Sequence, residues 1–273
     1  MKWAGGKRQI VPKLYALAPP EFDSYFEPFL GGGALFFHLI SNKNKPFTAY
    51  ISDINPELIN VYVAVKDDVE KLIKLLTQHQ IEYNKAPEEC YYKLRDNYNS
   101  DGIERAAQFI TLNRICFNGL YRVNKKGEFN APKGDYKNPT ICDADNLRNV
   151  SAALRYSNIT IKAADYKEML LENAREGDFI YLDPPYNPIS TTAYFTSYTA
   201  NGFSNKDQEK LAEMFRQLHE MKCKVILTNS NTPLVRELYS PFVITEVGSK
   251  RAINCNAPKR EGHSDLIICN YKL

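Results

Sequence analysis

The segment best suited to chemistry is a carboxylate followed by two prolines and an aromatic ring, Asp183-Pro184-Pro185-Tyr186. It directly follows the apolar run 179–182, which is typical of a short buried strand. Two adjacent prolines fix two φ angles and remove two N–H donors, so carbonyls on such a turn can point outward unpaired. Carboxylate and carbonyl oxygens beside a ring suit a planar amine. A Pro-Pro pair alone more often marks a plain strand ending, but the flanking Asp and Tyr favour a site.

A second segment, residues 25–37, runs from an aromatic strand through three glycines, 31–33, into an apolar helix start. A strand–glycine turn–helix unit opens a nucleotide-binding half. The glycines do not follow G-x-G-x-x-G, so the dinucleotide reading is weak. The next predicted strand, 49–52, ends at Asp53, at about the 20-residue offset where an acid accepts hydrogen bonds from ribose hydroxyls. The alternative for Asp53 is a helix N-cap.

The start of the chain, residues 2–8, combines its single tryptophan with glycines and cations. Trp3 offers a stacking face, the glycines allow close approach of the backbone, and Lys7 offers a counter-charge for a carboxylate or phosphate. No serine or threonine follows Gly6-Lys7, which rules against a Walker A loop. A frayed terminus is the alternative.

The middle of the chain lacks strand–helix alternation. Apolar residues between Leu58 and Leu76 recur every three or four positions, which is typical of one face of an amphipathic helix, and a second helix is predicted through 105–110. Turn motifs flanked by Tyr, Val and Phe then predict a hairpin within 113–139. This stretch holds six Lys and Arg against two Asp and Glu. Cations interleaved with aromatics and amides suit duplex DNA, and a solvated hairpin is the alternative.

Alternation returns after about residue 146. Strands are predicted at 159–163 (ending near Asp165), 224–228, 242–247 and 265–271, with a polar, basic loop at 248–262. Ser204 and Asp207 are spaced as a capping box for a helix. The predicted fold class is therefore α/β, with a Rossmann-like sheet covered by helices on both faces and an inserted helical and β-hairpin domain at 57–145.

Composition narrows the protein class. The chain has 273 residues, 44% hydrophobic and 25% charged, as in soluble globular proteins of one large or two small domains. No apolar run is long enough to span a bilayer, and no signal peptide opens the chain. The six cysteines are scattered without C-x-x-C spacing, which argues against a zinc site or a disulfide framework and favours the cytoplasm. The net charge of +3 is too small to indicate a polyanion partner by itself.

Together these motifs closely resemble the Dam-type, alpha-class DNA methyltransferases, which use S-adenosylmethionine to methylate N6 of adenine, usually in GATC. The resemblance covers nearly the entire chain. Its motifs are K-W-A-G-G-K at 2–7, F-E-P-F-L-G-G-G at 26–33, S-D-I-N at 52–55, N-G-L-Y-R at 118–122, G-E-F-N-A-P at 127–132, D-P-P-Y at 183–186 and F-T-S-Y at 195–198. The family's short leader before the first motif is expected to be missing.

The resemblance implies a role for each matching residue. The cofactor would be lined by Trp3, Lys7, Asp53 and Asp183, approached closely at Gly31 and Gly33, and contacted at its adenine amine by Asp165. In double-stranded DNA, Phe117 would be the wedge and Asn118, Leu120 and Arg122 would meet base edges, while Pro132 would touch a thymine methyl, Lys2 another base and Arg95 a phosphate. Asp135 departs from the pattern, since a cation is common there. The catalytic domain would comprise 1–56 and 146–273, and the target-recognition domain 57–145.

The chemistry separates most alternatives. Asp183 and the Pro184 carbonyl would accept hydrogen bonds from both N–H groups of the amine, while Tyr186 stacks on the flipped base. This reaction needs no metal and no covalent intermediate. Transfer to cytosine C5 needs a nucleophilic cysteine, typically after proline, and none of the six follows one. Cytosine N4 is the nearest rival, and Asp rather than Ser at 183 favours adenine.

Three further expectations complete the interpretation. A DNA-binding module without activity, and an RNA or protein-glutamine methyltransferase, stay open as rival functions. We expect no membrane association, and a monomer in solution that binds DNA in one or more copies. A role as the modification half of a restriction–modification system is also consistent with the motifs.

Overall fold

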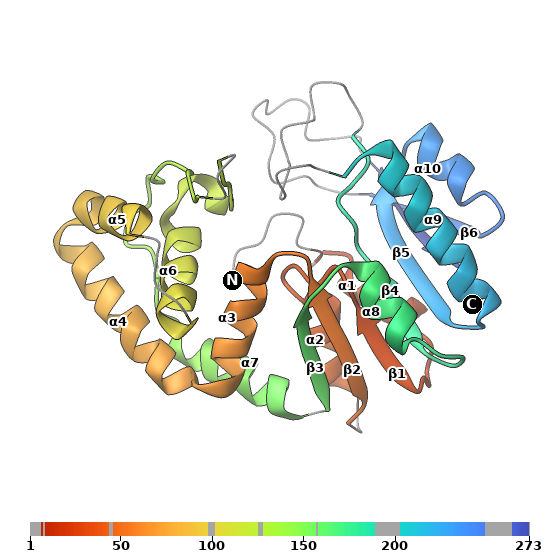
Figure 1. Cartoon of the computed structure of the whole chain (residues 1–273), viewed down its shortest axis with the longest axis horizontal. Coiled ribbons are helices and arrows are strands. Elements are labelled where there is room, and N and C mark those ends of the chain that lie inside the picture. Colours follow the sequence, from red (N-terminus) through yellow and green to blue (C-terminus); the bar gives the residue numbers. More distant parts are fainter. Residues whose placement is uncertain are drawn as a thin grey trace.

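A seven-stranded sheet forms the centre of the protein in the computed structural model (Figure 1). The structure describes residues 7, 9–43, 46–97, 102–124, 128–156, 158–188, 203–248 and 264–272. The strand order is β3-β2-β1-β4-β5-β7-β6. The strands are β1 (Ser24–Glu27), β2 (Thr48–Asp53), β3 (Ile159–Ala163), β4 (Phe179–Leu182), β5 (Lys224–Ser230), β6 (Val243–Gly248) and β7 (Ser264–Cys269). The predicted strands are therefore present, within two residues at most ends.

The order of the strands reverses between β1 and β4. The chain adds β2 and β3 on one side of β1 and then returns to place β4 on the other, with Tyr25 opposite Phe179 in parallel register. Strand β5 continues in parallel, whereas β7 is antiparallel to both β5 and β6. In open α/β sheets, ligands bind beyond the carboxyl ends of the strands at such a reversal. Glu27 ends β1 at this point, and Asp183 follows β4.

Alternate residues of each strand enter two different cores, because successive side chains point to opposite faces of a sheet. Tyr25 packs in the core that includes Leu14 and Leu35, whereas its neighbour Phe26 packs with Met169 and other residues of the opposite core. The first face is covered by α1 (Val11–Leu17), α2 (Ala34–Asn42) and α3 (Pro56–Asp67), and the second by α8 (Tyr166–Asn173), α9 (Asn205–Glu220) and α10 (Pro233–Leu238). The predicted α/β fold with helices on both faces is confirmed.

Of the remaining helices, three lie to the left of α3 in Figure 1 and one runs below it. The three are α4 (Val69–Lys85), α5 (Pro87–Asp96) and α6 (Gly102–Ile115), and the fourth is α7 (Ala144–Tyr156). Neither α5 nor α7 was predicted as a separate helix. The prediction of one helical face from Leu58 to Leu76 is wrong in its continuity. Asp68 leaves the helical conformation (φ −145°, ψ 65°), and its carboxylate accepts from the Lys71 N–H at 3.2 Å, so α3 ends and α4 begins there. A short carboxylate competes for backbone N–H groups and so favours caps over helix interiors.

A hairpin-like arm, described at residues 116–124 and 128–133, follows α6. Antiparallel bridges join Cys116 to Lys133 and Val123 to Phe129, which confirms the predicted hairpin in the described residues. Residues 125–127, the predicted Lys-Gly turn, lie outside them. The Asn-Gly pair does not form a hairpin turn. Asn118 and Gly119 have φ of 56° and 65° and belong to a short 3-10 turn, Phe117–Gly119.

Several predicted features fall on residues that the structure does not describe. These are Lys2 and Trp3, the F-T-S-Y motif at 195–198, and all but the first residue of the loop at 248–262. Among the described helices, none combines the length and apolar character needed to cross a membrane.

The capping box at the start of α9 is present as predicted. The Ser204 hydroxyl accepts from the Asp207 N–H at 3.3 Å, and the Asp207 carboxylate accepts from the Ser204 N–H at 3.0 Å. Each bond pairs a backbone N–H group that helix geometry leaves without an intrahelical partner.

Replacing Ser204 by Ala is expected to lower the free energy of unfolding by about 1 kcal/mol, because the first turn of α9 loses its cap. Urea denaturation measures this change. Ser204→Thr keeps the hydroxyl and serves as the control, and equal stability of the Ala variant and the wild type would contradict a stabilising cap.

Candidate active site

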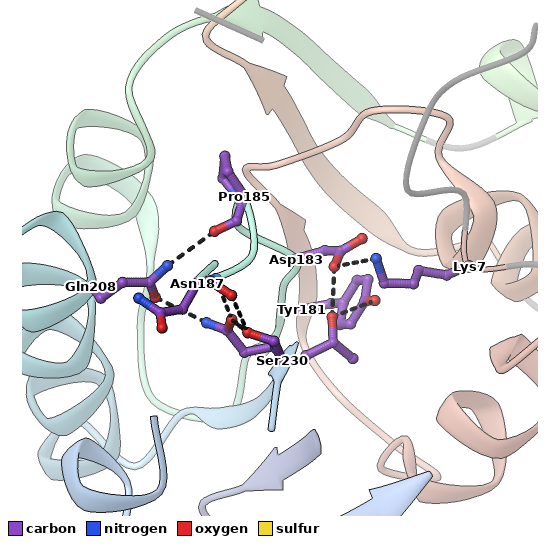
Figure 2. A network of polar contacts seen from close by, with 9 residues as sticks. Lys7, Tyr181, Asp183, Pro185, Asn187, Gln208 and Ser230 are labelled. Carbon is purple, nitrogen blue, oxygen red and sulfur yellow. Dashed lines mark hydrogen bonds and ion pairs between the residues drawn. The ribbon is translucent and has the colours of Figure 1, made fainter. Parts of the chain in front are cut away.

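The Asp183 carboxyl group lies between two donors just beyond β4 (Figure 2). Its Oδ1 atom is 2.9 Å from Nζ of Lys7 and accepts from the Thr228 hydroxyl at 2.7 Å. Lys7 Nζ also lies 4.3 Å from the centre of the Tyr186 ring, within cation–π range. The structure therefore brings together three predicted site residues, Lys7, Asp183 and Tyr186, from two segments far apart in the chain.

Burial and charge act in opposite directions on Asp183. Burial disfavours the charged carboxylate and raises its pKa, while Lys7 and the hydrogen bond from Thr228 lower it. The net pKa is above the ordinary value for aspartate. Because Lys7 is only 13% exposed in its side chain, water screens this ion pair weakly.

The turn that follows Asp183 is held by buried amides and a hydroxyl, shown on the left of Figure 2. Gln208 of α9 donates to the Pro185 carbonyl at 3.0 Å and accepts from the Asn229 amide at 2.9 Å. Asn229 accepts from the Asn187 N–H at 3.1 Å, and Ser230 donates to the Asn187 carbonyl at 2.5 Å. The motif Asp-Pro-Pro-Tyr-Asn is thus attached to β5 and α9 rather than being a free loop.

Sequence reasoning did not identify these supporting residues. Gln208, Thr228, Asn229 and Ser230 are all fully buried. The available indication was the polar run Thr228-Asn229-Ser230 at the end of an otherwise apolar strand. A buried polar group costs free energy unless it is hydrogen-bonded, so such a run at a strand's carboxyl end indicates that it holds something nearby.

The glycine turn is closed by Asp53 from the neighbouring strand. The two Asp53 oxygens accept from the N–H groups of Gly31 at 3.0 Å and Asn55 at 2.9 Å. Gly31 and Gly33 have φ of 47° and 62°, and a Cβ at Gly33 would lie 3.0 Å from the Phe37 ring. The positive φ favours glycine at both positions, and the nearby Phe37 ring disfavours a side chain at Gly33.

Asp53 does not act as the N-cap that the sequence left as its alternative role. The N-cap of α3 is Asn55, whose side-chain oxygen accepts from the Glu57 and Leu58 N–H groups. Burial raises the pKa of Asp53, and its two backbone hydrogen bonds lower it in part.

Most of the residues predicted to bind the cofactor lie at the carboxyl ends of four adjacent parallel strands. Asp165 follows β3, Asp53 ends β2, the glycine turn follows β1 and Asp183 follows β4. Asp165 also caps α8, accepting from the Lys167 N–H at 2.9 Å. A row of carboxylates beside a left-handed glycine turn fits a cofactor that has hydroxyl and amino donors and needs close backbone approach.

Glu27 is a buried carboxyl group that sequence reasoning missed. It is 2% exposed, and its Oε2 atom accepts from the Tyr25 hydroxyl at 2.7 Å and the Phe36 N–H at 3.1 Å. Burial, with a contribution from the negative charge of Asp183, raises the pKa of Glu27 to about 8, although both hydrogen bonds lower it. A charged residue inside the aromatic strand Tyr25-Phe26-Glu27 was the available indication.

The candidate DNA contacts gather on the arm. Phe117 is 54% exposed, Asn118, Arg122 and Pro132 are exposed, and Leu120 is half-buried. Arg122 donates from Nε to the Asn130 side chain and from Nη2 to the Asn130 carbonyl, both at 2.8 Å. One edge of the guanidinium is held by Asn130, and its other edge carries the remaining donors.

Arg95 lies on α5, next to the arm. Its Nε donates to Asp96 at 3.0 Å, and its guanidinium lies 4.6 Å from the centre of the Tyr92 ring. The buried Tyr91 hydroxyl donates to the Ala131 carbonyl at 2.7 Å, so α5 and the arm are joined directly. Asp135, the departure from the family pattern, is exposed.

Metal-ligating residues do not cluster in the part of the chain that the structure describes. No group of three or more His, Cys, Asp or Glu side chains there is arranged to hold an ion. The five cysteines in the described residues are free thiols.

Comparison with known proteins gives a consistent result. Residues 3–253 match the family described as D12 class N6 adenine-specific DNA methyltransferase. The chain is 44% identical to the Type II methyltransferase M1.LlaDCHI of Lactococcus lactis subsp. cremoris, over 99% of this chain and 94% of the relative. It is 44% identical to the Type II methyltransferase M.MjaIII of Methanocaldococcus jannaschii, over 99% and 98% of the two chains. It is 35% identical to the DNA adenine methylase of Serratia marcescens, over 98% and 96%.

The raised pKa of Glu27 predicts a pH dependence of stability. Between its ordinary pKa of 4.5 and the folded value of about 8, the unfolded chain releases a proton that the folded chain keeps. The contribution of Glu27 to the free energy of unfolding is therefore fully present below pH 4.5 and is lost as the pH rises to about 8. The loss is at most about 1.4 kcal/mol per pH unit. We expect Glu27→Gln, which stays neutral, to flatten this decline.

Denaturant unfolding at several pH values between the two pKa values measures the effect. The exposed Glu220→Gln is the matched control and is expected to follow the wild type. Parallel curves for the wild type and Glu27→Gln would contradict the prediction.

Proposed function

The chain belongs to the D12 class of N6 adenine-specific DNA methyltransferases, and we propose that it methylates adenine N6 within GATC, using S-adenosylmethionine and a base flipped out of duplex DNA. The observation that carries the proposal is the Asp183 carboxyl group, held by Lys7 and Thr228 beside the Tyr186 ring at the strand-order reversal.

Catalysis would require the target amine to become a better nucleophile, because its lone pair is delocalised into the adenine ring. Asp183 and the Pro184 carbonyl accept hydrogen bonds from the two N–H groups of the amine. These hydrogen bonds localise the lone pair on the amine nitrogen. Tyr186 stacks on the flipped base. Gln208 holds the next carbonyl, that of Pro185, on the protein side, which supports assigning Pro184 as the free acceptor. Positioning of this kind is worth on the order of 7–11 kcal/mol.

The cofactor would be held by Lys7, Gly31, Gly33, Asp53, Asp165 and Asp183, together with Trp3. When bound, S-adenosylmethionine supplies a methyl group on a positively charged sulfonium. The left-handed glycines and the row of carboxylates support this assignment. Lys7, whose Nζ atom is 2.9 Å from Asp183, places a positive charge at this end of the row.

DNA recognition would use the arm and α5. Phe117 enters the base stack, Asn118, Leu120 and Arg122 meet base edges, Pro132 touches a thymine methyl, Lys2 contacts another base and Arg95 a phosphate. In this scheme residues 57–145 form the target-recognition domain, and 1–56 with 146–273 the catalytic domain. The exposure of Phe117 and the orientation of Arg122 by Asn130 support it.

The relatives also indicate a cellular role. Two of them are named Type II methyltransferases, which supports a place as the modification half of a restriction–modification system. We propose a cytoplasmic enzyme that is monomeric in solution.

Plasmid methylation in a host without adenine methylation tests the reaction and its site. Plasmid from cells expressing the protein should resist an endonuclease blocked by methyladenine in GATC and be cut by one that requires it. Asp183→Ala should lose at least about 100-fold in rate, as when one group that stabilises a transition state is removed, and should still bind duplex DNA. Methylation on cytosine N4 or outside GATC would overturn the corresponding part of the proposal.

Arg122→Ala is expected to relax discrimination at one base pair by about 1–3 kcal/mol if its contact is bidentate. Methylation rates on duplexes with single substitutions in the site measure this. Lys137→Ala, on an exposed cation near the arm, is the control and should weaken binding equally for all sequences. An unchanged sequence preference in Arg122→Ala would exclude base reading by this residue.

A further inference from the structure

Both polar contacts described for the Asp183 carboxyl group are made by one of its oxygens. Lys7 Nζ and the Thr228 hydroxyl both meet Oδ1, at 2.9 and 2.7 Å. Figure 2 shows the other oxygen, Oδ2, turned away from these partners. A carboxyl group rotates readily about its last torsion, which has broad minima. Two donors on one oxygen restrict that rotation and so determine where Oδ2 points.

The hydrogen bonds at Thr228 have a defined direction. An ionised carboxylate only accepts, so the single hydroxyl hydrogen of Thr228 is directed to Asp183. The Tyr181 hydroxyl lies 3.1 Å from Thr228 Oγ1 and must then donate to it. The result is a relay from Tyr181 to Thr228 to Asp183, built on the adjacent strands β4 and β5.

The buried environment of Thr228 indicates that its hydroxyl is present for hydrogen bonding. Thr228 is fully buried, Tyr181 is 2% exposed, and Ile226 and Leu227 precede Thr228 on β5. Valine would occupy the same volume without the cost of burying a hydroxyl. Threonine is branched at Cβ and has few rotamers, whereas the Lys7 side chain has four rotatable bonds. Lys7 therefore supplies charge, and Thr228 supplies a rigid donor.

We propose that Thr228 is a positioning residue for methyl transfer. Its hydroxyl orients Asp183 so that Oδ2 accepts a hydrogen bond from one N–H group of the target amine. The inference rests on the proposed function, because it assigns Oδ2 to that amine. Tyr181 acts through Thr228 by directing its hydroxyl hydrogen. The other charged groups that affect Asp183 are Lys7 and the carboxylates Glu27 and Asp265, and none of them is altered in the test.

The test compares Thr228→Val, which keeps the shape of the side chain, with Thr228→Ser, which keeps the hydroxyl. For a duplex oligonucleotide, kcat of the Val variant should fall about 10- to 100-fold, as expected for a hydrogen bond to a charged group. The Kd for duplex DNA should stay within about twofold, because the variant keeps every residue assigned to DNA binding. The Ser variant should keep kcat within about threefold, a smaller loss than removal of the hydroxyl.

The pH profile gives a readout that loss of packing would not change. The Thr228 hydrogen bond lowers the pKa of Asp183, so the acid limb of kcat should move to higher pH in Thr228→Val and stay in place in Thr228→Ser. Tyr181→Phe leaves Thr228 present and should lower kcat less than Thr228→Val does. Thermal unfolding of each variant checks that the fold is intact.

Two results would refute the relay while leaving the proposed function in place. In the first, the wild type is active, Thr228→Val is equally active and its pH profile of kcat is unshifted. The other is a Ser variant as impaired as the Val variant, which would show that the hydroxyl is not what matters. A wild type that methylates no adenine in duplex DNA would instead refute the proposed function itself.

Discussion

The parallel pairing of β1 with β4 is the constraint on which the site depends. These strands are far apart in the chain, and Asp178 joins their starts by accepting from the Ser24 N–H at 3.0 Å, across 154 positions. Their carboxyl ends then emerge side by side, so the glycine turn and the Asp183 turn face the same space. A sheet that placed β4 elsewhere would leave both motifs intact in sequence and separate in space.

Charge at this reversal is balanced by protonation as well as by pairing. The negative charge of Asp183, a partly buried carboxyl group, contributes to the raised pKa of the buried Glu27, and the pKa of Asp183 is raised as well. The pKa of Glu27 is about 8, so this residue stays largely protonated at neutral pH, whereas Asp183 has the positive charge of Lys7 at 2.9 Å. The arrangement lowers the negative charge at the ends of β1 and β4. Buried like charges would otherwise destabilise the ends of both strands.

The turn after β4 is held in place because other elements satisfy backbone polar groups within it. Gln208, Asn229 and Ser230 bind the backbone of Pro185 and Asn187, so a change in the position of α9 or β5 would move this turn. Satisfied buried networks of this kind specify a single arrangement, since every alternative leaves a polar group without a partner. The arm is joined to α5 by the same logic through Tyr91.

The sequence by itself determined the local motifs, because turns, caps and strand alternation depend on neighbouring residues: the glycine turn before α2, the Ser204 cap and the carboxylate ending β4. The helix break at Asp68 was missed, since apolar periodicity continues across it. Only the tertiary structure decided which groups meet. Lys7 reaches Asp183, and the Thr228 hydroxyl donates to it from the neighbouring strand β5, although these segments are distant in the chain. Spacing along a sequence carries no information on such contacts, which depend on the order of strands in the sheet.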